Sequence, residues 1–383
     1  MQVRTIPRGP GAPRRVFAVD VVLLVTTVLV ATIGVVMVYT ASRGVLVSEG
    51  LDPHYYLKRQ LLFVVLGVVV MGLIALVDYR RLESLAMAIH GLIILSLLGV
   101  FVVGSHAQGS QRWFSLGPLQ LQPSEFAVLS LILAVATYCS RRSEGLAWRD
   151  VVRVLILAAV PIALVMAQPD LGTAVIMTIV LLVMLAVAGL PARILVILVL
   201  AAATVTVGAL ESGLLHHYQI VRLTSFLHQD SSTLSSQQAQ AVYNLNQAKN
   251  AIGSGGLFGQ GIGHGTQTNL GYVPEQQTDF IFTAVGEQLG FVGAVGVLGL
   301  LGVVAWRMLR DAKLARDPFG RLLCTGMFTF LVFSVFQNAG MTMGIMPITG
   351  IPLPFISYGG TAVLSFFMAV GLVLSVYARR GSL

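Results

Sequence analysis

The chain has 383 residues, of which 56% are hydrophobic and 10% are charged, and its formal net charge at pH 7 is +8. Soluble globular domains carry about 25% charged residues, so this composition excludes an ordinary soluble protein and indicates a polytopic membrane protein. In such a chain the excess of Arg and Lys reports orientation in the membrane and attraction to anionic lipid, and it does not indicate nucleic-acid binding.

Ten apolar runs of about 18 residues or more are long enough to cross about 30 Å of hydrocarbon as helices. They lie near residues 17–41, 60–78, 84–104, 123–140, 151–167, 171–189, 192–211, 280–306, 322–346 and 353–378. The first run is too long, and lacks a small-residue cleavage site, to be a removable signal peptide. We therefore expect an all-α protein with a basic tail at 1–16, one ten-helix membrane domain at 17–378 and a short segment at 379–383.

The basic residues orient the predicted helices, because Lys and Arg are retained on the cytoplasmic side of a membrane. With the N-terminus in the cytoplasm, 18 of the 24 basic residues lie on that side, namely Arg4, Arg8, Arg14, Arg15, Arg80, Arg81, Arg141, Arg142, Arg149, Arg153, Arg193, Arg307, Arg310, Lys313, Arg316, Arg321, Arg379 and Arg380. The other six lie outside, namely Arg43, Lys58, Arg59, Arg112, Arg222 and Lys249. The opposite orientation inverts this ratio, so we expect both termini in the cytoplasm.

The cysteine and histidine residues give no sign of a disulfide or a metal site. Cys139 and Cys324 both fall at predicted cytoplasmic ends of helices, where disulfides do not persist, so we interpret them as packing residues. The seven His show no HExxH motif or paired spacing, so no structural metal is expected.

One connection, residues 212–279, is far longer than the others and is expected to lie outside the membrane as a functional loop. Ser235 or Ser236 can cap a helix in it, and Gly253 can end that helix. Its apolar positions recur at helical spacing, at Ala239, Val242, Leu245, Ala248 and Ile252. We expect this helix to lie along the outer membrane surface.

The Gly-rich stretch GSGGLFGQGIGHG at 253–265 has two interpretations. No strand precedes it, so it lacks the context of a dinucleotide-binding fingerprint. It is either a flexible connection that lets backbone pack closely or a set of backbone amides that binds a phosphate.

Carboxylates and cations gather on the predicted outer side. The carboxylates are Asp279, Glu275, Glu287, Glu125 and Asp170, and the cations are Arg112, Arg222 and Lys249. A carboxylate at the start of an apolar stretch, as Asp279 is, costs several kcal/mol unless it has a partner or a function. Arg and Lys suit a pyrophosphate, and a carboxylate suits proton abstraction from a sugar hydroxyl. Together they indicate glycosyl transfer from a lipid pyrophosphate.

Each acid also has a structural interpretation. Asp279, and Glu125 after Pro123, can be first-turn acids that the helix dipole favours. Asp170 can be an Asx-type cap for the next helix. Glu287 lies two turns into its helix, where it can pair with another group inside the bundle.

The segment 347–360 contains too many Pro and Gly residues for an intact helix. Non-helical backbone at membrane depth needs protein or a water-filled cavity around it. One interpretation is a cavity wall to which Ser357 and Tyr358 offer hydroxyls, and the other is a kinked connection.

Four blocks of the sequence resemble the SEDS family of RodA, FtsW and SpoVE proteins over nearly the whole chain. They are GSQRWFSLGPLQLQPSEF (109–126), QPDLGTA (168–174), GGLFGQGIGHG leading into PEQQTDFIFTAVGEQLG (255–290), and NAGMTMGIMPITGIPLPFISYGG (338–360). The resemblance implies a ten-helix glycosyltransferase of the bacterial cytoplasmic membrane that polymerises lipid II together with a class B penicillin-binding protein. It places the catalytic aspartate of the TDF motif at Asp279. Residues 54–60 and 77–82 resemble the elongation subfamily, RodA, more than the division subfamily, FtsW.

One position departs from the family pattern. The family usually has a basic residue three positions after Glu125, and this chain has Val128 there. Either Arg112 or another cation compensates, or Glu125 is protonated, or the pair is dispensable in this chain.

The expected mechanism is an inverting displacement, since the family's donor is α-linked and its product is β-1,4-linked. Asp279 would take the proton of the acceptor 4-hydroxyl, without a covalent sugar intermediate, while Arg112, Arg222 and Lys249 stabilise the leaving pyrophosphate. A divalent cation can share that role, although no acidic cluster specifies one. The alternatives are a flippase for a lipid-linked precursor and a non-catalytic scaffold for the penicillin-binding protein.

Overall fold

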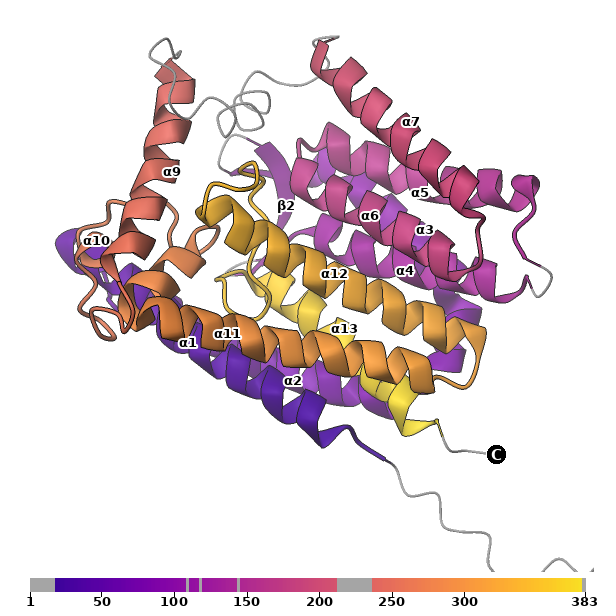
Figure 1. Ribbon diagram of the computed structural model, residues 1–383, viewed down its shortest axis with the longest axis horizontal. Coiled ribbons are helices and arrows are strands. Elements are labelled where there is room, and N and C mark those ends of the chain that lie inside the picture. The colour runs from indigo at the N-terminus through magenta and orange to yellow at the C-terminus, as the bar shows by residue number, and fades with distance from the viewer. Residues whose placement is uncertain (1–17, 108–109, 117–118, 143–144, 212–235, 381–383) are drawn as a thin grey trace, which may run out of the picture.

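The computed structural model describes residues 18–107, 110–116, 119–142, 145–211 and 236–380. Ten apolar helices make up its bundle: α1 (Val21–Ser48), α2 (Tyr55–Leu76), α3 (Tyr79–Val103), α4 (Pro123–Ser140), α5 (Trp148–Ala167), α6 (Leu171–Val187), α7 (Ala192–Glu211), α11 (Ile281–Leu314), α12 (Pro318–Thr342) and α13 (Gly360–Ala378). Within the described residues, eight of them are long and apolar enough to cross a membrane, and α6 and α7 are shorter apolar helices. The expected all-α membrane fold is confirmed (Figure 1).

Two helices form the centre of the bundle. The most apolar windows of α4 and α13 are 83% buried, whereas that of α3 is 22% buried, so α3 lies at the periphery. Small residues let α13 approach α2 closely: Gly371 lies against the Met71 backbone, and Gly67 faces the Phe367 ring. Cys139 and Cys324 are buried and form no disulfide, as expected of packing residues.

The helices differ from the predicted apolar runs by several residues at their ends, as in α1, which extends to Ser48, and two of these differences bear on the loop end. The run at 280–306 continues to Leu314, and it is interrupted at Gly290, whose φ of 68° and ψ of −169° lie outside the helical region. The run at 353–378 becomes helical only at Gly360, because residues 347–359 fold as an irregular segment, which confirms the expectation from their Pro and Gly content. Both breaks lie at the same end of the bundle.

A small antiparallel sheet between α3 and α4 was not predicted. It consists of β1 (Ser105–Ala107), β2 (Ser110–Leu116) and β3 (Leu119–Leu121) in the order β1-β2-β3. Phe114 pairs with Leu121 and Leu116 with Leu119, so only residues 117 and 118 connect β2 to β3. Such short connections are typical of hairpins.

The long connection carries α9 (Ser236–Ser254) and the short α10 (Thr266–Asn269). Helix α9 matches the helix expected there, and Val242, Leu245, Ala248 and Ala251 are its buried residues. It packs against α11 and runs crosswise to it at one end of the bundle (Figure 1). We call this the loop end, formed by the α1–α2, α3–α4, α5–α6, α7–α11 and α12–α13 connections, and we call the other the tail end.

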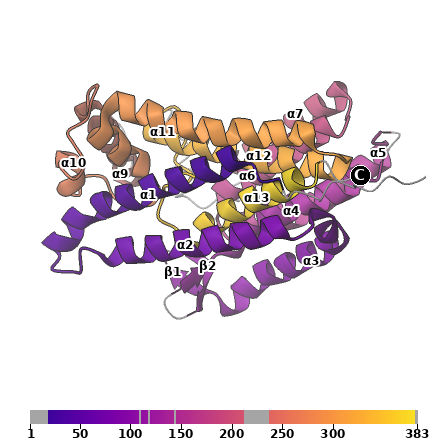
Figure 2. The same ribbon diagram turned by 90° about the horizontal axis from the view of Figure 1, so that it is seen from below.

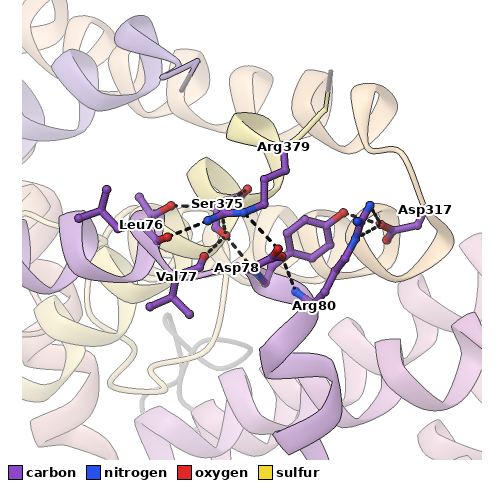
Figure 3. Close-up of polar contacts among 9 residues, drawn as sticks. Leu76, Val77, Asp78, Arg80, Asp317, Ser375 and Arg379 are labelled. Carbon is purple, nitrogen blue, oxygen red and sulfur yellow. Dashed lines mark hydrogen bonds and ion pairs between the residues drawn. The ribbon is translucent and has the colours of Figure 1, made fainter. Parts of the chain in front are cut away.

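At the tail end, polar contacts join α2, α3, α12 and α13 (Figure 3). The Arg379 guanidinium donates to the carbonyl oxygens of Leu76, at 2.7 Å, and of Ser375, at 3.0 Å. The Ser375 hydroxyl donates to the Val77 carbonyl at 2.6 Å, while the Tyr79 hydroxyl donates to Asp317. These bonds satisfy the carbonyls that end α2 and fix the turn into α3. Figure 2 shows α1 beside α2 on one side and α11 on the other, and all three helices extend to the loop end.

The two glycines of α2 at positions 67 and 72 test this packing. A Cβ at Gly67 would lie 2.2 Å from the Phe367 ring, whereas a Cβ at Gly72 would meet nothing within 4 Å. We expect Gly67→Ala to destabilise the protein by about 1–3 kcal/mol through overpacking. Gly72→Ala should be neutral or stabilise it by up to about 1 kcal/mol, because Ala favours the helix. Thermal unfolding of both variants in the same detergent measures the difference, and equal melting temperatures would contradict this packing.

Candidate active site at the loop end

Asp279 lies in a turn, residues 275–280, that directly precedes α11; we call it the Asp279 turn. The amide N–H groups of Thr278 and Phe280 both donate to the Glu275 carbonyl, at 3.2 and 3.5 Å. Gln276 and Phe280 are buried, whereas Asp279 is only partly buried. The turn therefore holds two carboxylates, the exposed Glu275 and the partly buried Asp279, over the buried side chains of Gln276 and Phe280.

The irregular segment at 347–359 holds the Asp279 turn from one side. The Ser357 hydroxyl donates to the Thr278 carbonyl at 2.6 Å, and the Tyr358 amide donates to the Gln277 carbonyl at 2.8 Å. From α12, the Asn338 amide donates to the carbonyls of both Asp279 and Ile351, at 2.8 Å each. Ser357, expected to offer its hydroxyl to a substrate, uses it here to position the backbone next to Asp279.

Tyrosines and Arg59 line the neighbouring surface. The Tyr358 ring contacts the Tyr56 ring edge-on at 4.7 Å between centroids, and the Arg59 guanidinium lies 4.4 Å from the centroid of the Tyr55 ring. Burial raises the pKa of the Tyr358 phenol, and a hydrogen bond to Arg59 opposes that shift. The phenol therefore remains protonated at neutral pH and can donate a hydrogen bond.

Arg59 was not among the site residues inferred from the sequence. It belongs to residues 54–60, HYYLKRQ, which were used above only to orient the helices and to compare subfamilies. The preceding residue, Lys58, is exposed and pairs with Asp52 at 2.8 Å, which lowers the pKa of that carboxyl. The ion pairs within the described residues do not include Arg59. The sequence feature that could have pointed to Arg59 is a basic residue shortly after two tyrosines, Tyr55 and Tyr56, at the start of a helix.

Glu287 is fully buried on α11, on the other side of the Asp279 turn. Its carboxylate accepts hydrogen bonds from the backbone amides of Gln267 and Thr268, at 2.7 and 3.0 Å, and from the Thr268 hydroxyl at 2.5 Å. These donors belong to the first turn of α10. Glu287 therefore caps that helix, although it lies about 20 residues further along the sequence. Of the two interpretations of Glu287, the geometry supports pairing inside the bundle, because the side chain is enclosed by protein.

The Gly-rich loop closes the break in α11. The amides of Gln260 and Gly261 donate to the Glu287 and Gln288 carbonyls, at 2.9 and 3.0 Å, and the amide of Phe291 donates to the loop carbonyl of Gly256 at 2.9 Å. A Cβ on Gly259 would lie 2.2 Å from the Gln288 carbonyl oxygen. Of the two interpretations of this loop, the geometry supports close backbone packing, because these amides are already bonded.

Asp170 joins α4 and α6 beside the irregular segment. As the N-cap of α6 it accepts bonds from the amide and the hydroxyl of Thr173, at 3.2 and 3.0 Å. It also accepts a bond from the Ser124 hydroxyl at 2.9 Å and from the Gln122 side chain at 3.1 Å. These contacts support the structural interpretation of Asp170 as the cap of α6.

Glu125 is buried in the first turn of α4, within electrostatic range of Asp170 and the Ser365 hydroxyl. Val128, one turn further, is fully buried in the hydrophobic core. None of the ion pairs among the described residues involves Glu125. Arg112, on β2, donates to the Pro169 carbonyl and so joins the sheet to the α5–α6 turn.

The remaining predicted residues are placed as follows. Lys249 is partly buried on α9, and Glu275 is exposed with a left-handed φ of 49°. Arg222 lies outside the described residues. No cluster of three or more His, Cys, Asp or Glu side chains that could hold a metal occurs in the part of the chain that the structure describes.

The irregular segment lies between Asp170 and Glu125 on one side and the Asp279 turn on the other. A Cβ on Gly172, in the first turn of α6, would lie 2.7 Å from Ile351 and 2.9 Å from the Thr349 carbonyl. The Ile351 carbonyl in turn shares the Asn338 side chain with the Asp279 carbonyl. One segment thus connects Asp170 and Glu125 to the Asp279 turn.

Comparisons with known proteins identify the family. The family model described as "Cell cycle protein", for FtsW, RodA and SpoVE proteins, matches residues 20–381. Stage V sporulation protein E of Bacillus subtilis (strain 168) is 37% identical over 369 residues, which cover 94% of this chain and 98% of that protein. Peptidoglycan glycosyltransferase MrdB of Escherichia coli (strain K12) is 36% identical over 325 residues, which cover 85% of this chain and 86% of that protein.

A solved structure is also similar. Its description is "Structural coordination of polymerization and crosslinking by a peptidoglycan synthase complex", and one of its chains aligns with a TM-score of 0.80 at 31% identity, over 95% of this chain and 99% of that one. The family match and the extent of these alignments agree with the four sequence blocks. The chain belongs to the FtsW, RodA and SpoVE family, also called SEDS.

Proposed function

We propose that this protein is a peptidoglycan glycosyltransferase that polymerises lipid II into β-1,4-linked glycan strands, with Asp279 as its general base. The observation that carries the proposal is the Asp279 turn, which holds a partly buried carboxylate at the loop end. It is supported by the name of the similar protein MrdB, a peptidoglycan glycosyltransferase.

In the proposed mechanism, Asp279 accepts the proton of the acceptor sugar's 4-hydroxyl as that oxygen attacks the anomeric carbon of the donor. The lipid pyrophosphate leaves, and the configuration inverts because a single displacement occurs. Fixed backbone on either side of Asp279 favours this step, since a base must lie within hydrogen-bonding reach of the proton that it removes. Asn338 and Ser357 supply two of these fixed contacts.

Cations at the loop end would stabilise the charge of the leaving pyrophosphate. Arg112 and Lys249 are the described members of the predicted set, and Arg222 is the third. We add Arg59, because it lies beside Tyr358 and takes part in none of the described ion pairs. Arg can bind two phosphate oxygens at once, which suits a pyrophosphate. A divalent cation is compatible with this role.

The loop end would face the outside of the bacterial cytoplasmic membrane, with both termini in the cytoplasm. The described tail end carries 14 Arg and Lys residues and the described loop end carries five, namely Arg43, Lys58, Arg59, Arg112 and Lys249. Such a bias is typical of a cytoplasmic tail end. The substrate then meets Asp279 on the side of the membrane where the cell wall is built.

We propose a class B penicillin-binding protein as the partner and cell elongation as the process. The similar structure of a peptidoglycan synthase complex supports the partner. The residues of the HYYLKRQ and VDYRRL segments support elongation. A flippase or a scaffold would not require Asp279.

Replacement of Asp279 tests the proposed base. We expect Asp279→Ala to lower the rate of glycan polymerisation from purified lipid II by about 10²- to 10⁴-fold, the usual contribution of a general base. The assay uses the purified chain with and without a co-expressed class B penicillin-binding protein. The matched control is Asp52→Asn, an exposed carboxylate at the same end that contacts only His54 and Lys58 of its own loop and helix start. It should retain the wild-type rate.

Two outcomes would contradict the proposal. Normal polymerisation by Asp279→Ala would remove this residue from the role of base. No polymer from the wild type under either condition, with translocation of lipid II in vesicles, would favour the flippase.

Arg59 and Lys58 form a matched pair for the pyrophosphate site. We expect Arg59→Gln to lower kcat/KM for lipid II at least tenfold, because a charged contact to a phosphate is lost. Lys58→Gln removes the same charge from the adjacent exposed position, where Lys58 pairs with Asp52, and should leave kcat/KM within twofold of the wild type. Equal effects of the two substitutions would show that only overall charge matters.

A further inference from the structure

We infer that Glu287, Thr268 and Gln276 are positioning residues that set the geometry of the Asp279 turn from the side opposite to the irregular segment. Together with Thr283 we call them the buried relay. This inference rests on the proposed role of Asp279. It assigns Glu287 a function that requires no contact with substrate.

The relay is a continuous chain of hydrogen bonds. The Thr268 hydroxyl donates to Glu287 at 2.5 Å and accepts from the Gln276 side-chain amide at 3.1 Å. The same amide donates to the Thr283 hydroxyl at 2.9 Å, and that hydroxyl donates to the Phe280 carbonyl at 2.6 Å. Each of the two hydroxyl groups thus donates one hydrogen bond and accepts another from the Gln276 amide.

Burial shows that these side chains serve the protein interior. Glu287, Thr268 and Thr283 are 0% exposed and Gln276 is 2% exposed. Direct contact of the Glu287 carboxylate with a substrate would require the structure to open. The carboxylate instead has three donors, two of them backbone amides, and charge-assisted bonds of this kind are strong and short.

The relay reaches both flanks of Asp279. Gln276 lies three residues before Asp279 in the chain, and the Phe280 carbonyl belongs to the residue that follows it. On the other side Ser357, Tyr358 and Asn338 hold the carbonyls of residues 277–279. The backbone of the turn is therefore held by two separate sets of contacts, one from the relay and one from the irregular segment and α12.

The relay also links the base to the Gly-rich loop. Glu287 is the residue whose carbonyl accepts the Gln260 amide, and its carboxylate caps α10. A Cβ on Gly265 would lie 2.8 Å from that carboxylate, so the loop encloses it closely. The anion thereby fixes α10, and α10 fixes Gln276 through Thr268.

Thr268→Val is the sharpest test, since it removes the hydroxyl and keeps the shape of the side chain. We expect kcat for lipid II polymerisation to fall about tenfold to a hundredfold with KM unchanged, because misplacing a catalytic group by about 1 Å has effects of this size. Thr268→Ser, which restores the hydroxyl, should recover most of kcat. The control is Thr27→Val, another fully buried threonine, whose hydroxyl bonds to the Leu23 carbonyl far from the site.

A second variant tests the connection. Gln276→Leu should reduce kcat by a similar factor, and the double variant should be no worse than either single one, because both break the same chain of bonds. Multiplicative losses, a rise in KM at constant kcat, or an unchanged kcat in Thr268→Val would each overturn the relay. A lower melting temperature with normal kcat per folded molecule would also overturn it, since that result describes a purely structural bond.

Hydrogen exchange separates this inference from the proposed function. Amides of residues 276–283 should exchange faster in Thr268→Val than in the wild type, and Thr27→Val should leave them unchanged. This readout does not depend on polymerisation. If the wild type makes no polymer, the proposed function fails, and the relay stands or falls on these exchange rates alone.

Discussion

The structure depends on one constraint, the need to satisfy backbone groups where helices are broken at the edge of a membrane bundle. Each free N–H or C=O in an apolar environment costs several kcal/mol, so a broken helix needs partners from elsewhere in the protein. Here the break at Gly290 and the irregular segment at 347–359 occur at the same end. The Gly-rich loop bonds to the first, and the Asp279 turn bonds to the second. The site is thus made of the segments that repair these breaks.

Three acids at the loop end, Asp170, Glu287 and Glu125, are buried, whereas Asp279 is only partly buried and its backbone carbonyl is held by Asn338. Asp170 caps α6, and Glu287 caps α10 from within the core. Glu125 is enclosed beside Asp170, with Val128 in the hydrophobic core one turn away. Fixed acids of this kind make a rigid frame, which a general base requires because its distance to the reacting proton controls the rate. Buried carboxylates therefore hold the frame, and a partly buried carboxylate, that of Asp279, is the proposed base.

Hydropathy was enough to predict the ten helices, because length and apolar composition follow directly from the thickness of the bilayer. It was not enough to locate the break in α11. Gly290 is one of several glycines in that helix, and Gly293 and Gly296 remain helical. What distinguishes Gly290 is its contact with the loop at 255–261. A Cβ on Gly290 would lie 2.2 Å from the amide nitrogen of Gly259, so no larger residue fits there. Hydropathy does not predict the sheet between α3 and α4 either, because its strands have only three to seven residues.

The contacts that hold Asp279 have a consequence for biogenesis. Asn338 belongs to α12, and Ser357 and Tyr358 directly precede α13, so these contacts to the Asp279 turn come from segments that are synthesised after it. Chains fold from the N-terminus during synthesis, and earlier helices can insert before these partners exist. The Asp279 turn then acquires its final shape only when α12 and residues 347–359 are in place. A chain that lacks these segments would contain Asp279 but not the contacts that position it. Activity would therefore depend on the assembly of α12 and the irregular segment with the rest of the bundle.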